Sequence, residues 1–223
     1  MSLILNIDTA LDIASVCLSK EGNVLQLSSS ENQKDHASWL HTAIAELLQK
    51  SGHSSKDLDA VAVSVGPGSF TGLRVGLAAA KGFCYALSIP LITLNSLAII
   101  AFAVKDEALD MICPLIDARR MEVFTAIYDK DLREKISPHA MIVDEKSFAS
   151  FLLQGKVLFC GNGARKLQPI LSNSNAFFSN IVADASHLAR LSFNCYKNKE
   201  FADLAYTEPL YVKDFYSPTA GTD

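Results

Sequence analysis

Apolar residues in the first third of the chain follow two periods, one typical of strands and one typical of helices. Apolar stretches over residues 3–8, 14–19 and 24–30, separated by short polar segments, predict three strands in an antiparallel meander. Over residues 36–50 the apolar positions recur every three or four residues, and Gly52 follows the last of them. That spacing predicts an amphipathic helix with a glycine just past its end.

Buried strands then alternate with helices. Residues 60–65 predict a buried strand, 71–87 a helix, 91–94 a strand and 96–104 a second helix. The first half therefore has the order β, β, β, α, β, α, β, α. The second half repeats that order, with strands at 111–117, 123–129, 140–143, 156–160 and 176–181, and helices at 145–153, 164–171 and 185–197.

Short similar sequences at corresponding positions of the two halves support this internal repeat. The run IDTA ends the first strand of one half at Asp8, and IDAR ends the first strand of the other at Asp117. The runs GPG and GNG end another corresponding pair of strands. We therefore predict two α/β lobes, residues 1–104 and 105–223, with the end of the second packing back on the first. This duplicated order resembles that of actin, the sugar kinases and the 70-kilodalton heat-shock chaperones, the actin-like (ASKHA) fold.

Composition narrows the classes of function. The 223 residues hold 20 Lys and Arg against 24 Asp and Glu, a formal net charge of −4, so strong autonomous binding to nucleic acid is not expected. Apolar residues make up 49% of the chain and charged residues 20%. This excess of apolar residues over the usual balance indicates either a large core or a surface covered by a partner.

Neither membrane insertion nor secretion is expected. No charged residue lies between Lys81 and Lys105, but Pro90 and Asn95 interrupt that stretch, which predicts helix, short strand and helix. The first residues lack the basic start of a secretory signal, and the five cysteines show no metal-binding spacing. We expect a cytoplasmic protein with reduced thiols.

The most specific motif is the run SVGPGSFTGLRVG, residues 64–76, where a buried strand turns into a helix. Backbone amides at such a helix start attract anions. The run lacks the Gly-Lys-Ser/Thr of a P-loop and matches the dinucleotide fingerprint only in part. In a simpler interpretation, the glycines permit a tight turn and close helix packing, and Ser69 or Thr71 caps the helix.

This motif makes the resemblance specific. Together with the first-strand IDTA, the run GPGSFTGLRVG resembles the TsaB (YeaZ) family, the bacterial partner proteins in biosynthesis of N6-threonylcarbamoyladenosine (t6A) on tRNA. The run IDAR, the pair Gly161 and Gly163 and the run EPLYV at residues 208–212 agree in order. The resemblance covers residues 2 to about 213.

The resemblance implies that the paralogue TsaD carries the metal, the ATP and the transfer step, and that this chain carries no cofactor. TsaD-like enzymes hold their metal with two histidines four residues apart. Here His36 and His41 lie five apart, which turns their rings about 140° apart around a helix. No metal site is expected.

In working members of the fold, an acid at the end of the first strand of each lobe holds a metal-bound phosphate. In this chain Asp8 and Asp117 occupy those places, but the following turns lack the glycine that lets a backbone close on phosphate. We predict a vestigial nucleotide or anion site formed by Asp8, Thr9, Gly66, Gly68, Ser69 and Asp117. In the alternative interpretation, both acids cap turns.

Two helices are the predicted partner surface. Apolar stripes of this kind form the core in most proteins, but the resemblance implies that TsaB-like proteins pair with TsaD, or with themselves when alone, through their first two helices. The residues expected to make this contact are His36, Trp39, Leu40, Ile44, Leu47, Thr71, Gly72, Leu73, Arg74, Gly76, Leu77, Ala80 and Phe83.

The predicted function is that of a non-catalytic partner. It scaffolds TsaD, helps recruit the ATPase TsaE, and meets tRNA only through the complex that modifies adenosine 37 of ANN-decoding tRNAs. The main alternative is an independently active enzyme of the same fold, a small-molecule kinase or a peptidase. A more distant alternative is a dinucleotide-binding module.

Overall fold

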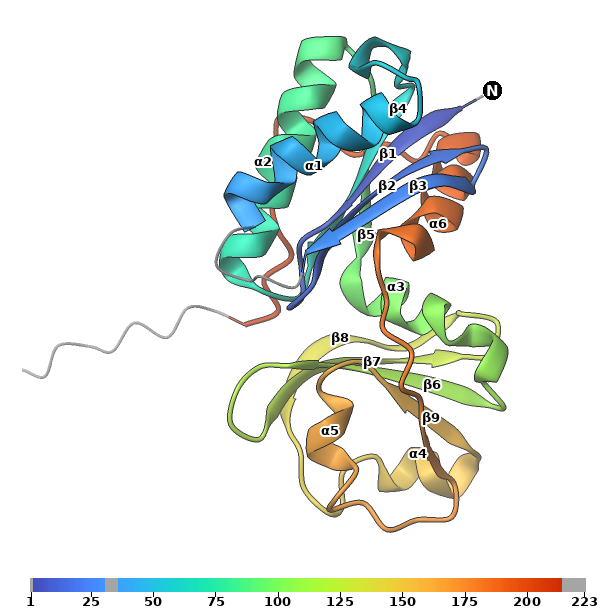
Figure 1. Ribbon diagram of the computed structural model, residues 1–223. Coiled ribbons are helices and arrows are strands. Elements are labelled where there is room, and N and C mark those ends of the chain that lie inside the picture. The colour runs from blue at the N-terminus through green and yellow to red at the C-terminus, as the bar shows by residue number, and fades with distance from the viewer. Residues whose placement is uncertain (1, 31–35, 214–223) are drawn as a thin grey trace, which may run out of the picture.

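Two five-stranded mixed sheets form the framework of the molecule (Figure 1). The computed structural model describes residues 2–30 and 36–213, except the side chain of His36. The first sheet has the order β3-β2-β1-β4-β5, from β1 (Leu3–Asp8), β2 (Ala14–Lys20), β3 (Asn23–Ser30), β4 (Ala60–Gly66) and β5 (Leu91–Asn95). The second has the order β10-β9-β6-β7-β8, from β6 (Met111–Asp117), β7 (Glu122–Asp129), β8 (Glu134–Ile142), β9 (Val157–Cys160) and β10 (Ala176–Phe178).

The two sheets have the same topology. Strand β1 pairs antiparallel with β2 and parallel with β4, and β6 pairs in the same way with β7 and β9. Replacing each strand of the first sheet by the strand five places later gives the second sheet. The predicted duplication of an actin-like α/β unit is therefore confirmed, because this pairing follows the repeated element order read from the sequence.

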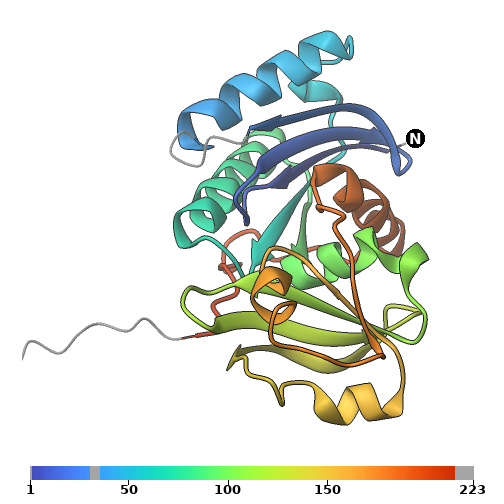
Figure 2. The ribbon, with the colours of Figure 1, turned by 60° about the horizontal axis from the view of Figure 1, so that its bottom comes forward.

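Helices cover the sheets in layers. Helices α1 (His36–Lys50) and α2 (Phe70–Leu87) lie on one face of the first sheet, and α6 (Ala185–Asn198) lies on the other (Figures 1 and 2). Helix α3 (Ser96–Ala103) lies between the sheets, and α4 (Ala149–Gln154) and α5 (Ala164–Leu167) cover the outer face of the second sheet. Strands β1 and β4 are almost wholly buried, as expected of strands covered on both faces.

Helix α6 follows the second sheet in the sequence but packs on the first. Inside this contact Ser192 donates a hydrogen bond to Asn6 Oδ1 at 2.6 Å, and the amide of Ala185 donates one to Ser15 Oγ at 2.8 Å. These buried hydrogen bonds fix the helix on β1 and β2. Helix α6 thus returns to the first sheet. The predicted boundary at residue 104 stays a prediction.

A segment after α6, residues 201–213, extends this return, and we call it the C-terminal strap. The amide of Ala202 donates a hydrogen bond to the carbonyl oxygen of Leu91 at 2.8 Å. The amide of Leu210 donates one to the carbonyl oxygen of Val65 at 2.7 Å. Lys213 then forms an ion pair with Glu122, at 2.8 Å. The strap therefore runs from the edge of the first sheet to the second.

Several predicted element bounds need correction in the second half. The helix predicted at 145–153 is only α4, because Phe148 adopts a left-handed conformation (φ 64°) and the residues before it form a turn held by Asp144. The helix predicted at 164–171 ends at Leu167, and the strand predicted at 176–181 ends at Phe178. Strand β8 is longer than its apolar stretch at 140–143, because backbone pairing with β7 extends it through polar residues. Within residues 2–30 and 36–213, no helix is long and apolar enough to cross a membrane.

Candidate functional site: an inter-lobe cleft and a groove between two helices

Asp8 lies beneath the surface of the fold. Its side chain is buried at the end of β1, where Oδ1 accepts hydrogen bonds from Ser64 Oγ at 2.6 Å and from the amide of Ala10 at 3.1 Å. Burial raises the pKa of Asp8, and the two hydrogen bonds offset only part of that effect. Asp8 therefore caps a turn, as the alternative interpretation predicted, and its place in the predicted anion site is wrong.

The glycine-containing run at residues 64–76, which we call the glycine block, brings α2 against the end of β1. A Cβ at Gly72 would overlap the carbonyl oxygen of Thr9, and Thr9 Oγ1 in turn donates a hydrogen bond to the carbonyl of Gly72 at 2.7 Å. A Cβ at Gly66 would lie 2.7 Å from the carbonyl oxygen of Leu210 in the strap. Thr9 and Gly66 thus serve close packing in the fold, and the prediction that they bind an anion stays a prediction. The predicted cap is present, since Ser69 Oγ accepts from the amide of Gly72.

The remaining predicted site residues line a cleft between the lobes. Gly68, Ser69 and Asp117 face a cavity of about 720 Å³, bounded by the β1–β2 turn, the first turn of α2, the β6–β7 turn and the start of α5. Ligand sites typically have volumes of roughly 300–1,000 Å³. Two arginines that sequence reasoning did not select, Arg119 and Arg165, also line it. The cleft is therefore large enough for a ligand.

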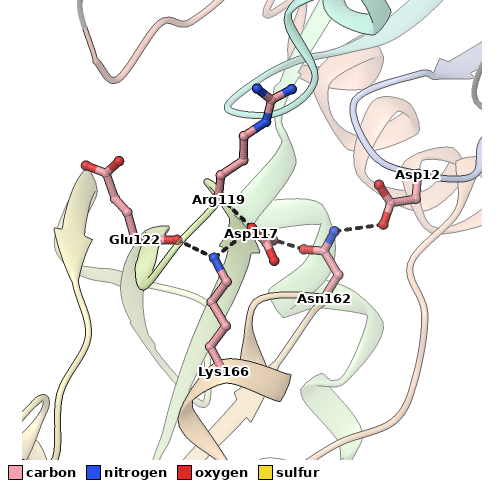
Figure 3. Close-up of polar contacts among 6 residues, drawn as sticks. All are labelled: Asp12, Asp117, Arg119, Glu122, Asn162 and Lys166. Carbon is pink, nitrogen blue, oxygen red and sulfur yellow. Dashed lines mark hydrogen bonds and ion pairs between the residues drawn. The ribbon is translucent and has the colours of Figure 1, made fainter.

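A polar network holds Asp117 (Figure 3). Asp117 Oδ1 lies 2.7 Å from Lys166 Nζ and accepts the amide of Arg119 at 2.6 Å. Asn162 Oδ1 accepts the backbone amide of Asp117 at 2.9 Å, and Asn162 Nδ2 donates to Asp12 at 3.2 Å, which joins the two lobes. Partial burial alone would raise the pKa of Asp117, but the hydrogen bonds from Lys166 and Arg119 hold it below its usual range.

These surroundings do not fit the metal-bound phosphate of the actin-like enzymes. Asp8 is buried beneath Ser64, and the carboxylate of Asp117 is already paired with the ammonium of Lys166. Within the described part of the chain, no group of three or more His, Cys, Asp or Glu side chains could hold a metal ion. His41 is exposed on α1, whereas the side chain of His36 lies outside the described residues.

A second concave surface lies between α1 and α2. It has a volume of about 600 Å³ and is predominantly apolar. From α2 the exposed residues Ala78, Gly82 and Ala86 recur every four residues along the groove, and Phe83 lies beside them. A Cβ at Gly82 would meet no atom within 4 Å, so the packing of the chain itself does not require a glycine there. Helix α1 contributes His41 and Ala37.

The predicted partner surface must be corrected at the level of residues. Most of its members are buried inside the chain and pack against the first sheet: Leu40, Ile44, Leu47, Gly72, Leu73, Gly76, Leu77 and Ala80. They form the core because they occupy the sheet-facing sides of both helices, so their prediction as contact residues is wrong. Trp39 and Phe83 are half-buried, Thr71 lines the inter-lobe cleft, and Arg74 bonds to Tyr211 of the strap at 3.0 Å.

Sequence reasoning missed some of the residues that line these two surfaces. Ala78 and Ala86 were available from helical spacing, since they lie on the side of α2 opposite to its buried residues. Nothing in the sequence indicated that Arg165 lines the cleft or that Lys166 holds Asp117, since Lys166 pairs with a residue 49 positions earlier. Contacts between distant segments of that kind do not follow from local spacing.

Comparison with known proteins shows which family the chain is similar to. A family model described as "TsaD: tRNA N6-adenosine threonylcarbamoyltransferase" matches residues 28–207. The tRNA threonylcarbamoyladenosine biosynthesis protein TsaB of Bacillus subtilis is 30% identical over 220 residues, which cover 94% of this chain and 93% of that protein. TsaB of Escherichia coli is 34% identical over 129 residues, 57% of this chain and 55% of that protein.

A solved structure agrees with these relatives. YeaZ from Pseudomonas aeruginosa superposes with a TM-score of 0.82 and 25% identity, over 95% of this chain and 100% of that one. The family model and the Bacillus relative both span most of the chain, and the duplicated topology and the glycine block are those expected from the sequence resemblance. The chain therefore belongs to the TsaB family of tRNA threonylcarbamoyladenosine biosynthesis proteins.

Proposed function

We propose that this chain acts in the biosynthesis of threonylcarbamoyladenosine in tRNA as a non-catalytic partner of TsaD. In this role it binds TsaD, holds it in its active arrangement and helps recruit TsaE, while tRNA is met through the complex. The observation that carries the proposal is the apolar groove between α1 and α2, in a chain that belongs to the TsaB family.

The groove suits a helix of another protein. Ala78, Gly82 and Ala86 present little side-chain volume, so a helix can approach α2 closely, and Phe83 and Leu87 add apolar area. No internal packing explains the lack of a side chain at Gly82. An exposed apolar groove of this kind is a common feature of protein–protein contacts. We expect TsaD to occupy it in the complex, and a second copy of this chain to occupy it when TsaD is absent.

The acids at the strand ends support a non-catalytic role. An actin-like enzyme needs a carboxylate that faces the cleft and can hold a metal-bound phosphate. In this chain Asp8 is buried and Asp117 is paired with Lys166. We therefore expect no ATP hydrolysis by this chain alone, and we assign the chemistry of the complex to its partners.

Binding to TsaD can be tested with one substitution and a matched control. Ala78→Glu places a charge in the apolar groove at an exposed position, so the chain should still fold. We expect it to weaken TsaD binding by at least about tenfold in calorimetric titration. Ala149→Glu makes the same change at an exposed position on the second lobe, and should bind TsaD like the unaltered chain.

The same two variants test self-association. Sedimentation of the chain alone should show a dimer for Ala149→Glu and a monomer for Ala78→Glu. Equal TsaD affinity for both folded variants would show that the groove is not the docking surface. Unchanged affinity together with a monomer would assign the groove to the homodimer alone.

A further inference from the structure

Helix α2 has three sides with different neighbours. Its buried residues pack on the first sheet, and the groove lies along a second side, around Gly82. Phe70, Arg74 and Lys81 lie four and seven residues apart, so they share a third side. The C-terminal strap, red in Figure 1, lies against this third side, where the rings of Phe70 and Tyr211 are 5.4 Å apart between centres.

Side chains of α2 anchor the strap. Lys81 Nζ donates hydrogen bonds to the carbonyl oxygens of Ala205 at 3.2 Å and Thr207 at 2.9 Å. Farther along the strap, Arg74 Nε donates to the hydroxyl oxygen of Tyr211 at 3.0 Å. Hydrogen bonds from a charged donor are among the stronger ones in proteins. The strap is therefore well attached to the helix that carries the groove.

Gly66 gives the strap its place at the end of β4. A Cβ at Gly66 would lie 2.7 Å from the carbonyl oxygen of Leu210, whose amide donates to the carbonyl oxygen of Val65 at 2.7 Å. The run EPLYV at residues 208–212 thus meets the glycine block at this point. The absence of a side chain at Gly66 is explained by the strap, without any ligand.

Beyond this point the strap reaches the second lobe. Lys213 Nζ lies 2.8 Å from each carboxylate oxygen of Glu122, at the start of β7. The carbonyl oxygen of Glu122 accepts a hydrogen bond from Lys166, which pairs with Asp117 (Figure 3). The side chain of Lys213 is 52% exposed, and exposed ion pairs are individually weak. The attachment to the second lobe is therefore easier to release than the attachment to α2.

We propose that the C-terminal strap is a tether that fixes the orientation of α2, and with it the groove, relative to the second lobe. Helix α3 joins the lobes by apolar packing, and packed helices can slide by small amounts. The strap adds a connection outside that core, and the ion pair of Lys213 with Glu122 completes it. This tether belongs to the chain alone and does not depend on which protein occupies the groove.

The distance between spin labels on the two lobes, measured by double electron–electron resonance, tests the tether. The labels are attached at Tyr85→Cys on α2 and Gln154→Cys on α4, both exposed positions, in a Cys195→Ser background. The other four cysteines are buried, and burial raises the pKa of their thiols, which slows their labelling. We expect one narrow distance distribution for the chain with an intact strap.

Two lysine substitutions separate the tether from a general effect of lost charge. Lys213→Met should raise the population outside the narrow peak by about two- to fivefold, the range expected for one exposed ion pair. Lys135→Met is the matched control, since Lys135 is 54% exposed and pairs with Asp129 inside the second lobe. It should leave the distribution unchanged. Arg74→Gln weakens the anchor on α2 and should broaden the distribution as Lys213→Met does.

Salt gives a second signature. At about 1 M NaCl the Debye length falls to about 3 Å, which screens an exposed ion pair. The distribution of the unaltered chain should therefore broaden in salt, whereas that of Lys213→Met should not broaden further.

Three results would overturn the proposal. They are equal distributions for Lys213→Met and the unaltered chain, equal broadening in Lys213→Met and Lys135→Met, and broadening by salt that persists in Lys213→Met. Both lysines are exposed, so both variants should stay folded. None of these outcomes bears on TsaD binding, which the groove variants test separately.

Discussion

The buried carboxyl group of Asp8 shows how one residue can keep its position in a fold and lose the role expected of that position. It lies at the end of β1, as an acid that serves a phosphate would, yet it is bonded to Ser64 and to the Ala10 amide beneath the surface. Because burial raises its pKa, the folded chain binds a proton at Asp8 more tightly than the unfolded chain.

That shift makes stability depend on pH in a definite direction. Above the ordinary pKa of 3.8, stability should fall as pH rises through the raised pKa, because the folded state must then ionise a buried acid. Asp8→Asn stays neutral, so its free energy of unfolding should exceed that of the unaltered chain by an amount that grows with pH. Each unit by which the pKa is raised corresponds to about 1.4 kcal/mol. The difference is measured by urea unfolding from pH 3 to 8, and a difference that does not rise anywhere in that range would contradict this account.

Asn6 is a second buried polar residue, and its side-chain hydrogen bonds lie inside the fold. Its amide nitrogen donates to Ser19 Oγ at 2.9 Å, and its oxygen accepts from Ser192 of α6. Asn6→Ala would leave both hydroxyls buried without that partner, and should lower the free energy of unfolding by about 2 kcal/mol. The exposed Asn198→Ala should change it by less than about 0.5 kcal/mol. Equal effects of the two substitutions in urea denaturation would show that the network does not fix α6.

At the scale of elements, helix α2 shows which features of a helix the sequence predicts and which it does not. Its existence followed from spacing, and a cap at Ser69 or Thr71 followed from the residue types; the structure has the cap at Ser69. The side to which its small residues point did not, because Gly72 and Gly76 serve close packing on Thr9 whereas Gly82 faces the groove. Glycine spacing alone does not separate a sheet-facing side from an open one.

Two glycine substitutions in this helix should therefore have opposite effects. Gly72→Ala would place a methyl group against the Thr9 carbonyl and should lower the free energy of unfolding by about 1–3 kcal/mol. Gly82→Ala meets open space and should raise it by up to about 1 kcal/mol, because alanine has the higher helix propensity. Thermal or urea unfolding of both variants measures the effects. Destabilisation of similar size in both would contradict the assigned packing.

At the scale of the whole molecule, the repeated element order was readable because each lobe repeats the same periods and turn motifs. The return of α6 to the first sheet was predicted only in general terms, since the hydrogen bond from Ser192 to Asn6 spans 186 positions. Arg165 likewise lines a cleft whose walls come from both lobes, and Lys166 bonds to Asp117 and to the carbonyl of Glu122, 49 and 44 positions earlier in the chain. Local patterns therefore predict the lobes well and the surfaces between distant segments poorly.

The central claim is that this chain enables TsaD without doing the chemistry, through the groove between α1 and α2. It is tested most directly by measuring threonylcarbamoyladenosine formed on tRNA in a mixture of TsaD, TsaE and the threonylcarbamoyl-adenylate synthase. The account predicts little product without this chain, full product with it or with Ala149→Glu, and a large loss with Ala78→Glu. Full modification in the absence of this chain would contradict it.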